Sequence, residues 1–348
     1  MAPRYRRAVA ALAVLLAATA CSGGAAPTAG RPTAPSPAAG GTATGSTVAS
    51  PSTSGAAAPA VDPAAVHADE LGAVPVLMFH QVVAAPAGEY DQTPGQFRAV
   101  LEQLYSHGFR TVTAADLVAR HLDLPAGAKP MVLTFDDSTV SQYGEAADGT
   151  VRPDTAVGLL LAVGRAHGEE RPVATFYVNG APFGGHPEYL AHLHALGMEL
   201  GDHTLTHANL RRLDDAGAQR ELAAGLQVIT SAVPGAEVTT MALPYGVFPH
   251  AHALASTGAG YRFAAVMLVG ANPAPSPYSA AFDPLNLPRI RSGRLSGDQA
   301  FTAAYWLPRL FDGQVAPYVS DGDPSRVSFP RAVAARLAAP FAAQARPY

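Results

Sequence analysis

Residues 131–137 read Met-Val-Leu-Thr-Phe-Asp-Asp, a mostly apolar run that ends in two adjacent carboxylates. Such an uncharged run of β-branched and large apolar residues is typical of a strand that is buried on both faces. The carboxyl ends of parallel strands form the rim on which α/β barrels carry their functional groups. The stretch therefore predicts a parallel α/β sheet with Asp136 and Asp137 at its rim.

Short runs rich in β-branched and aromatic residues alternate with helical stretches on both sides of this strand. The predicted strands cover residues 74–79, 131–135, 173–178, 199–201, 239–243, 263–268 and 287–291, and the predicted helices cover residues 96–107, 113–121, 154–167, 187–196 and 214–232. This alternation implies parallel pairing, and about seven strands suit an open or distorted barrel. A doubly wound sheet is the competing architecture, but no Gly-rich loop follows the first strand, which argues against a dinucleotide fold.

The two carboxylates have different predicted roles, because successive side chains of a strand point to opposite sides. Adjacent Asp136 and Asp137 do not suit a glycosidase, which needs two carboxylates across a cleft. We predict one metal ligand and one base. The alternative is that Asp-Asp-Ser caps the following helix.

A second polar cluster, Gly-Asp-His-Thr-Leu-Thr-His at residues 201–207, follows another predicted strand. On a helical turn, residues four apart share one face, so His203 and His207 can reach a single ion. The spacing alone is weak evidence in a chain with 12 histidines. Together with one carboxylate of the Asp pair, it gives the three-ligand set of a catalytic zinc site. We expect Zn²⁺, with Co²⁺ or Ni²⁺ as alternatives.

Two more strand ends carry candidate residues. Leu243-Pro244-Tyr245-Gly246 forms either a plain strand-terminating turn or a turn that exposes a backbone N–H to stabilise an oxyanion. The run at residues 74–80 ends in His80. On the rim, this histidine can protonate a leaving amine; otherwise it only ends the strand with a polar group.

These four segments together resemble the polysaccharide deacetylases of the NodB-homology class, carbohydrate esterase family 4. The resemblance covers roughly residues 74–291 and rests on Thr134-Phe135-Asp136-Asp137, His203-Thr204-Leu205-Thr206-His207 and Leu243-Pro244-Tyr245-Gly246. It implies a distorted (β/α) barrel and metal-assisted removal of acetyl groups from N-acetylated sugars. It also implies a general base, an oxyanion donor and a set of metal ligands, which by position are Asp136, the Tyr245 backbone N–H, and Asp137, His203 and His207.

Several positions depart from the family pattern. Ser138 stands where the first motif usually has Gly, and Ala242 stands where the third motif often has an Arg that orients the base. Arg289 or Arg291 can supply that support. No Leu-x-His occurs near the C-terminus, whereas Leu77-Met78-Phe79-His80 resembles the permuted arrangement of poly-N-acetylglucosamine deacetylases. We therefore expect His80 to be the general acid.

The resemblance leaves two other functions open. The same site can act on O-acetyl esters such as acetylated xylan. Without the orienting Arg, the chain would be an inactive sugar-binding module that retains its metal.

The N-terminus predicts export. Arg4, Arg6 and Arg7 precede an apolar run at residues 8–18, and Cys21 is the only cysteine of the chain. This pattern is typical of a signal peptide at residues 1–21, and the run is short for a membrane span. Cys21 lies where a bacterial lipoprotein is lipidated, although an ordinary secretory signal is the alternative. We expect a protein held on the outer face of the cell membrane through Cys21, or a secreted one.

The rest of the chain falls into a tether and one catalytic domain. Residues 22–65 are mainly Ala, Pro, Gly, Ser and Thr and predict a disordered linker. The domain spans residues 70–348, with an extension from about residue 292, in which Trp306 either stacks on sugar rings or anchors a helix. Residues 138–171 form either a loop over the rim or surface padding, and we favour padding.

The net charge of the chain and the distribution of its basic residues narrow the classes of molecule that it is expected to bind. A formal charge of -4 and scattered basic residues argue against binding to nucleic acid. We expect a monomer whose partner is an N-acetylated polysaccharide.

Overall fold

The structure is a computed structural model that describes residues 61–293 and 299–348. The predicted signal peptide, Cys21 and most of the predicted linker lie outside the described residues. Within those ranges, no helix has the length and apolar character needed to cross a bilayer. Packed structure begins before the first strand, because Ala68 and Leu71 are already buried.

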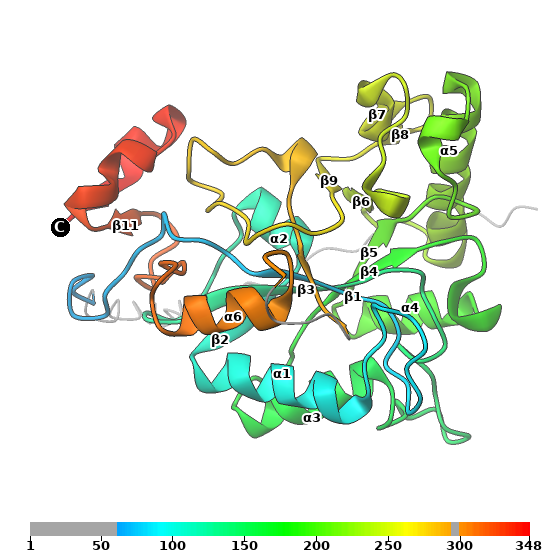
Figure 1. Ribbon diagram of the computed structural model, residues 1–348, viewed down its shortest axis with the longest axis horizontal. Helices are drawn as coiled ribbons and strands as arrows, with labels where there is room; N and C mark the ends of the chain where they lie inside the picture. The colour runs from blue at the N-terminus through cyan, green and yellow to red at the C-terminus, as the bar shows by residue number, and fades with distance from the viewer. Residues whose placement is uncertain (1–60, 294–298) are drawn as a thin grey trace, which may run out of the picture. The chain divides into compact units, whose positions relative to one another are not determined.

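A parallel sheet forms the centre of the fold (Figure 1). Seven of its strands follow the order β10-β1-β3-β4-β5-β6-β9, and β2 pairs with the first half of β3. The bounds are β1 (Val76–Phe79), β2 (Phe109–Val112), β3 (Lys129–Phe135), β4 (Thr175–Val178), β5 (Glu199–Asp202), β6 (Thr240–Ala242), β9 (Ala265–Met267) and β10 (Ile290–Arg291). From β1 to β9 the order advances in one direction without the reversal of a doubly wound sheet. The curled half-barrel confirms the predicted distorted (β/α) barrel.

Helices connect these strands, as the sequence predicts. They are α1 (Pro94–Ser106), α2 (Ala114–Ala119), α3 (Ala156–Ala166), α4 (Glu188–Ala195), α5 (Asp215–Ala232) and, in the C-terminal extension, α6 (Ala303–Phe311). All but α4 begin after a side chain that accepts the backbone N–H three residues further on; these caps are Thr93, Thr113, Thr155, Asp214 and Thr302. Each such bond satisfies an N–H that has no partner inside the helix. Polar residues just before each apolar stretch therefore set where these helices begin.

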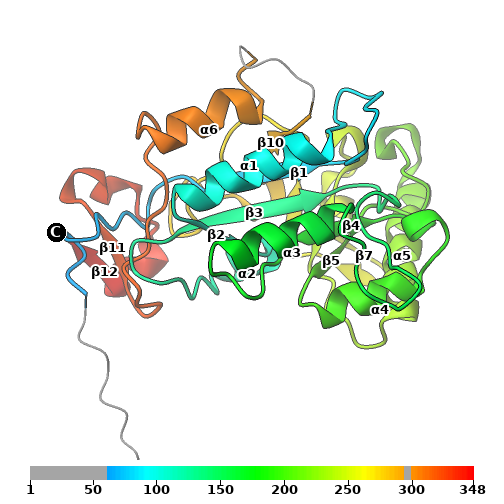
Figure 2. The same cartoon turned by 90° about the horizontal axis from the view of Figure 1, so that it is seen from below.

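Smaller elements complete the chain. Short 3₁₀ helices cover Pro182–Gly184, Leu210–Arg212, Pro244–Gly246, His252–Ala255, Pro284–Asn286, Arg331–Arg336 and Ala339–Gln344. Strands β7 (Thr257–Gly258) and β8 (Tyr261–Arg262) pair antiparallel, and β11 (Val327–Phe329) pairs in parallel with β12 (Ala345–Pro347). Figure 2 shows β11 and β12 beside the C-terminus, away from the carboxyl ends of the central strands.

Side chains of β3 alternate between two apolar layers. Leu133 and Phe135 pack into a cluster that includes buried residues of α1, α3 and α5. Val132 belongs to a second cluster, on the inner side of the sheet, which the C-terminal segment helps to close. Because side chains two apart share a face, Thr134 and Asp136 follow Val132 into the interior. This register places the first carboxylate inside the half-barrel.

Strand β2 is an element that the sequence analysis missed. It has only four residues, two of them Arg110 and Thr111, and it pairs only with residues 129–132 of β3. A strand so short and polar does not stand out from a loop in the pattern of apolar residues. By contrast, the last predicted strand is shortened to β10, because Pro288 has no N–H to donate to a neighbour.

Candidate metal and catalytic site

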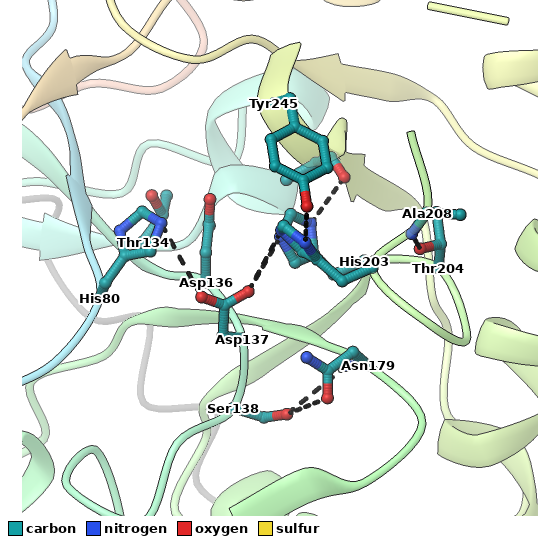
Figure 3. A network of polar contacts seen from close by, with 12 residues as sticks. His80, Thr134, Asp136, Asp137, Ser138, Asn179, His203, Thr204, Ala208 and Tyr245 are labelled. Atoms are coloured by element: carbon teal, nitrogen blue, oxygen red, sulfur yellow. Dashed lines mark hydrogen bonds and ion pairs between the residues drawn. The ribbon is translucent and has the colours of Figure 1, made fainter. Parts of the chain in front are cut away.

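The predicted site residues lie at the carboxyl ends of neighbouring strands (Figure 3). His80 follows β1, Asp136 and Asp137 follow β3, His203 follows β5, and Tyr245 lies in the 3₁₀ turn after β6. Because β1, β3, β5 and β6 all run in the same direction, segments that are distant in sequence meet at one rim.

Three side chains converge on one point. Oδ1 of Asp137 lies 3.5 Å from Nε2 of His203 and 3.4 Å from Nε2 of His207. One potential ligand atom from each residue lies within 4.8 Å of the other two. Two imidazoles and one carboxylate form the donor set of a catalytic zinc site, which leaves a position for water.

The surroundings of His203 fit such a metal site. Its Nδ1 lies 2.8 Å from the carbonyl oxygen of Ala242, so this nitrogen carries the proton. Its Nε2 is buried and has no hydrogen-bond partner among the described residues. A carbonyl that holds the far nitrogen while the near one faces a carboxylate is the usual setting of a metal-bound histidine. These residues therefore fit a divalent ion such as Zn²⁺.

The backbone around the site is unusual. Three non-glycine residues of the site have left-handed backbones, with φ of 74° at Asp137, 54° at His207 and 60° at Tyr245. Such residues cost about 1–3 kcal/mol each and persist where the surrounding structure holds them. Their concentration at one rim marks it as a candidate functional site.

The prediction that His203 and His207 lie on a helical turn is wrong. The segment contains bends rather than a helix, and Thr204 has φ of 64°. Tertiary contacts hold it instead, because the Leu205 carbonyl accepts from the Gly180 N–H at 2.7 Å and the Thr206 N–H donates to Glu221 of α5 at 2.8 Å. The two imidazoles meet through this loop and not through helical spacing.

Ser138, which stands where the family's first motif usually has glycine, adopts a backbone conformation that favours glycine. Ser138 has φ of 44°, in the left-handed region that glycine adopts without strain. This explains why glycine suits the position. Asp136-Asp137-Ser138 does not cap the next helix, since Thr155 caps α3.

Asp136 pairs with Arg289 inside the half-barrel. Nη1 and Nη2 of Arg289 donate to the two carboxylate oxygens of Asp136 at 2.7 and 2.8 Å. Arg289 also donates to Thr134 and to the carbonyl of Leu268. Burial alone would raise the pKa of Asp136, but the charge of Arg289, with that of His203, holds this pKa well below its usual range. Asp136 is therefore ionised at neutral pH.

Of the two candidate arginines, only Arg289 faces Asp136. The Arg291 guanidinium lies over the rings of Phe301, at 4.6 Å, and Tyr90, at 6.0 Å. Arg289, which precedes β10, thus supplies the arginine that the family's third motif often has at the position of Ala242.

His80 lies on the other side of Asp137. Its Nε2 is 4.0 Å from Oδ2 of Asp137, and its ring stacks on Tyr90 with a centroid distance of 4.8 Å. Burial lowers the pKa of His80, while Asp136 and Asp137 act in the opposite direction. The structure therefore brings His80 to the edge of the Asp137, His203 and His207 cluster.

Gln142 is a site residue that the sequence analysis missed. Its buried Nε2 donates to the backbone carbonyls of both His80 and Asp136, at 2.9 and 2.6 Å. It thereby ties the ends of β1 and β3 together. The prediction that residues 138–171 only pad the surface is therefore wrong at Gln142. No local sequence pattern marks this glutamine.

Trp306, in the C-terminal extension, anchors α6, because its indole N–H donates to the carbonyls of Ala271 and Ala300.

Part of this chain is similar in sequence to known proteins. Residues 123–264 match the family model of polysaccharide deacetylases. The chain is 31% identical over 131 residues to a chitooligosaccharide deacetylase of Bradyrhizobium sp. (strain ANU 289), a match covering 38% of this chain and 52% of that protein. It is 32% identical over 92 residues to one of Sinorhizobium fredii (strain NBRC 101917 / NGR234), covering 26% and 43%. The matches thus span about half the length of these relatives.

Solved structures share the fold. A Streptococcus pyogenes deacetylase in complex with acetate has a TM-score of 0.50 at 18% identity, covering 64% of this chain and 93% of that chain. A polysaccharide deacetylase from Bacillus cereus has a TM-score of 0.51 at 18% identity, covering 69% of each chain. The half-barrel fold, the motifs and the match to the family model agree, so residues 123–264 resemble a polysaccharide deacetylase domain.

Proposed function

We propose that this chain is a metal-dependent deacetylase that removes N-acetyl groups from a cell-envelope or extracellular polysaccharide and releases acetate. One observation carries the proposal. Asp137, His203 and His207 converge on one point, while Asp136 stands beside them, ionised and paired with Arg289. The names of the curated relatives, both chitooligosaccharide deacetylases, support the same reaction class.

The residues divide the chemistry of amide hydrolysis. Asp137, His203 and His207 would hold a divalent ion, which when bound supplies Lewis acidity toward the amide carbonyl and toward water. Asp136 removes a proton from the attacking water, because its pKa keeps it ionised. As the C–O bond forms, the Tyr245 backbone N–H donates to the developing oxyanion. His80 then protonates the sugar nitrogen as the C–N bond breaks, which leaves a free amine and acetate.

The placement of Arg289 argues against an inactive module. A module that only bound sugar would need no buried arginine holding the carboxylate beside the metal ligands. An O-acetyl esterase stays open as the second candidate, because a base and an oxyanion donor serve esters as well as amides.

The test is acetate release by the metal-loaded protein from oligomers of N-acetylglucosamine, poly-N-acetylglucosamine, peptidoglycan and acetylated xylan. We expect release of acetate with one new free amine per acetate from an N-acetylated polymer. Release from xylan alone would identify an esterase. No release from any substrate, with one bound metal per chain confirmed, would contradict the proposal.

We also propose that the enzyme acts outside the cell, tethered through a lipid on Cys21. The support is the residue pattern before Cys21, a signal-like segment with a single cysteine. A Cys21→Ser variant should leave the membrane fraction while retaining its specific activity. Recovery of both proteins in the soluble extracellular fraction would show that Cys21 is not lipidated.

A further inference from the structure

A hollow opens directly beside the proposed metal site. It has a volume of about 460 Å³ and is lined by Ala208, Asn209, Arg212, Leu213 and Tyr245. Two of these residues join it to the site, since Ala208 follows His207 and the Tyr245 hydroxyl lies 3.2 Å from Nδ1 of His207 (Figure 3). A polymer with one sugar at the metal ligands can therefore place a neighbouring sugar in this hollow.

The Tyr245 side chain forms one wall of the hollow. It is 61% exposed, which is unusual for a large aromatic ring. Its ring contacts the His207 ring edge-on, with centroids 4.7 Å apart and planes at 65°. The contact of its hydroxyl with Nδ1 of His207 holds the ring in this direction. An exposed aromatic ring held this way offers a flat surface for a sugar ring.

Arg212 is the charged residue among the five that line the hollow, and its charge is positive. The other four lining residues are uncharged. Among residues 61–293 and 299–348, the arginine–carboxylate ion pairs involve Arg152, Arg289 and Arg326, and not Arg212. Asp214, two positions later, accepts the Gly217 N–H as the cap of α5 and does not line the hollow. The Arg212 guanidinium is thus available to a ligand.

We propose that this hollow is a subsite for an anionic sugar, namely a neighbour of the acetylated residue that carries a carboxylate. The inference rests on the proposed function and goes beyond it to the class of polymer. Tyr245 packs against the ring of that sugar, and Arg212 donates two hydrogen bonds to its carboxylate. In a chain of net charge -4, such a local cation offsets the general repulsion of an acidic polymer.

Two chemical sources offer this carboxylate, a uronic acid and the lactyl ether of a muramic acid. The test compares kcat/KM of the metal-loaded protein on three tetrasaccharides. One is the neutral N-acetylglucosamine tetramer, and in the others N-acetylglucosamine alternates with a uronic acid or with N-acetylmuramic acid. We expect at least one acidic tetrasaccharide to be preferred, and the preferred one identifies the source.

Arg212→Gln should lower the ratio of kcat/KM for the acidic over the neutral substrate about tenfold, which is the usual scale of one charge-assisted pair. Arg211→Gln is the matched control. It removes the same charge one position away, but Arg211 contacts His252 and does not line the hollow. This control should keep the wild-type ratio. Raising the ionic strength should reduce the wild-type preference and leave that of Arg212→Gln nearly unchanged.

Equal turnover of acidic and neutral substrates by the wild type, or equal effects of the two arginine variants, would overturn the subsite. If neither these tetrasaccharides nor the polymers named above are deacetylated, the proposed function fails, and calorimetric binding of the same three compounds decides the subsite separately. Weaker binding of an acidic tetrasaccharide to Arg212→Gln than to Arg211→Gln supports it. Equal binding to both variants overturns it.

Discussion

Arg289 donates hydrogen bonds to both carboxylate oxygens of Asp136, although 153 positions separate the two residues in the chain. Neither side chain reaches solvent, at 0% and 1% exposure. The guanidinium also donates to Thr134 and to the Leu268 carbonyl, so four of its five N–H groups have a named acceptor. The pair thereby orients the proposed base and compensates a charge that could not otherwise stay buried.

Removing the arginine alone should destabilise the fold. Arg289→Met leaves the Asp136 carboxylate buried and unpaired, so we expect the free energy of unfolding in urea to fall by about 3–5 kcal/mol. Arg291→Met is the control, because the Arg291 guanidinium lies over aromatic rings and forms no ion pair with a carboxylate of the described residues; it should cost about 1 kcal/mol or less. The double variant Arg289→Met, Asp136→Leu should recover most of the loss. A double variant as unstable as Arg289→Met would show that the unpaired charge is not the cause.

The base can be separated from the metal ligands. Asp136→Asn keeps the shape of the side chain but cannot accept a proton from water, so we expect turnover to fall about 10²–10⁴-fold. Metal content, measured by mass spectrometry, should stay close to one per chain. The exposed Asp148→Asn change is the control and should leave turnover unaltered. Normal turnover by Asp136→Asn would remove this residue from the mechanism.

Metal binding should depend on His203 and not on His80. His203→Ala removes one of the three converging ligands, and we expect metal affinity to fall by at least 100-fold in a chelator competition. His80 lies 4.0 Å from Asp137 but is not one of the converging ligands. His80→Ala should therefore retain the metal while losing turnover. Equal metal loss in both variants would place His80 among the ligands.

A buried acid away from the site predicts a pH dependence of stability. Burial raises the pKa of Glu70 from 4.5 to about 7, and its carboxylate contacts Tyr318 and the Ser328 N–H. Between these pH values the folded state holds a proton that the unfolded chain has released. The contribution is therefore fully present below pH 4.5 and is lost as the pH rises through 7, a change of about 3 kcal/mol.

The measurement is the free energy of unfolding in urea from pH 4 to pH 8. Glu70→Gln cannot ionise, so its stability should fall less with pH than that of the wild type. Glu237→Gln, a surface change, is the control and should follow the wild type. Parallel curves for Glu70→Gln and the wild type would mean that Glu70 titrates normally in the folded protein.

Much of the fold follows from local patterns. The seven predicted strands and five predicted helices all occur, because period-two and helical spacing of apolar residues, with polar caps, are short-range signals. The same signals place Asp136, Asp137 and His203 after strands. In a parallel sheet those ends must meet, so a common rim for these residues can be inferred before any contact is seen.

The rest depends on contacts between distant segments. Arg289 and Arg291 are equivalent in sequence, and only the path of the chain before β10 turns Arg289 toward Asp136. No pattern marks Gln142, whose amide bridges two strand ends, and the loop of His203 and His207 is shaped by Glu221 of α5 rather than by helical spacing. The sequence by itself thus specifies the strands and the chemical groups at their ends. Tertiary structure decides which groups pair, because a buried charge or an orphan N–H is satisfied by whatever the folded chain brings within about 3 Å of it.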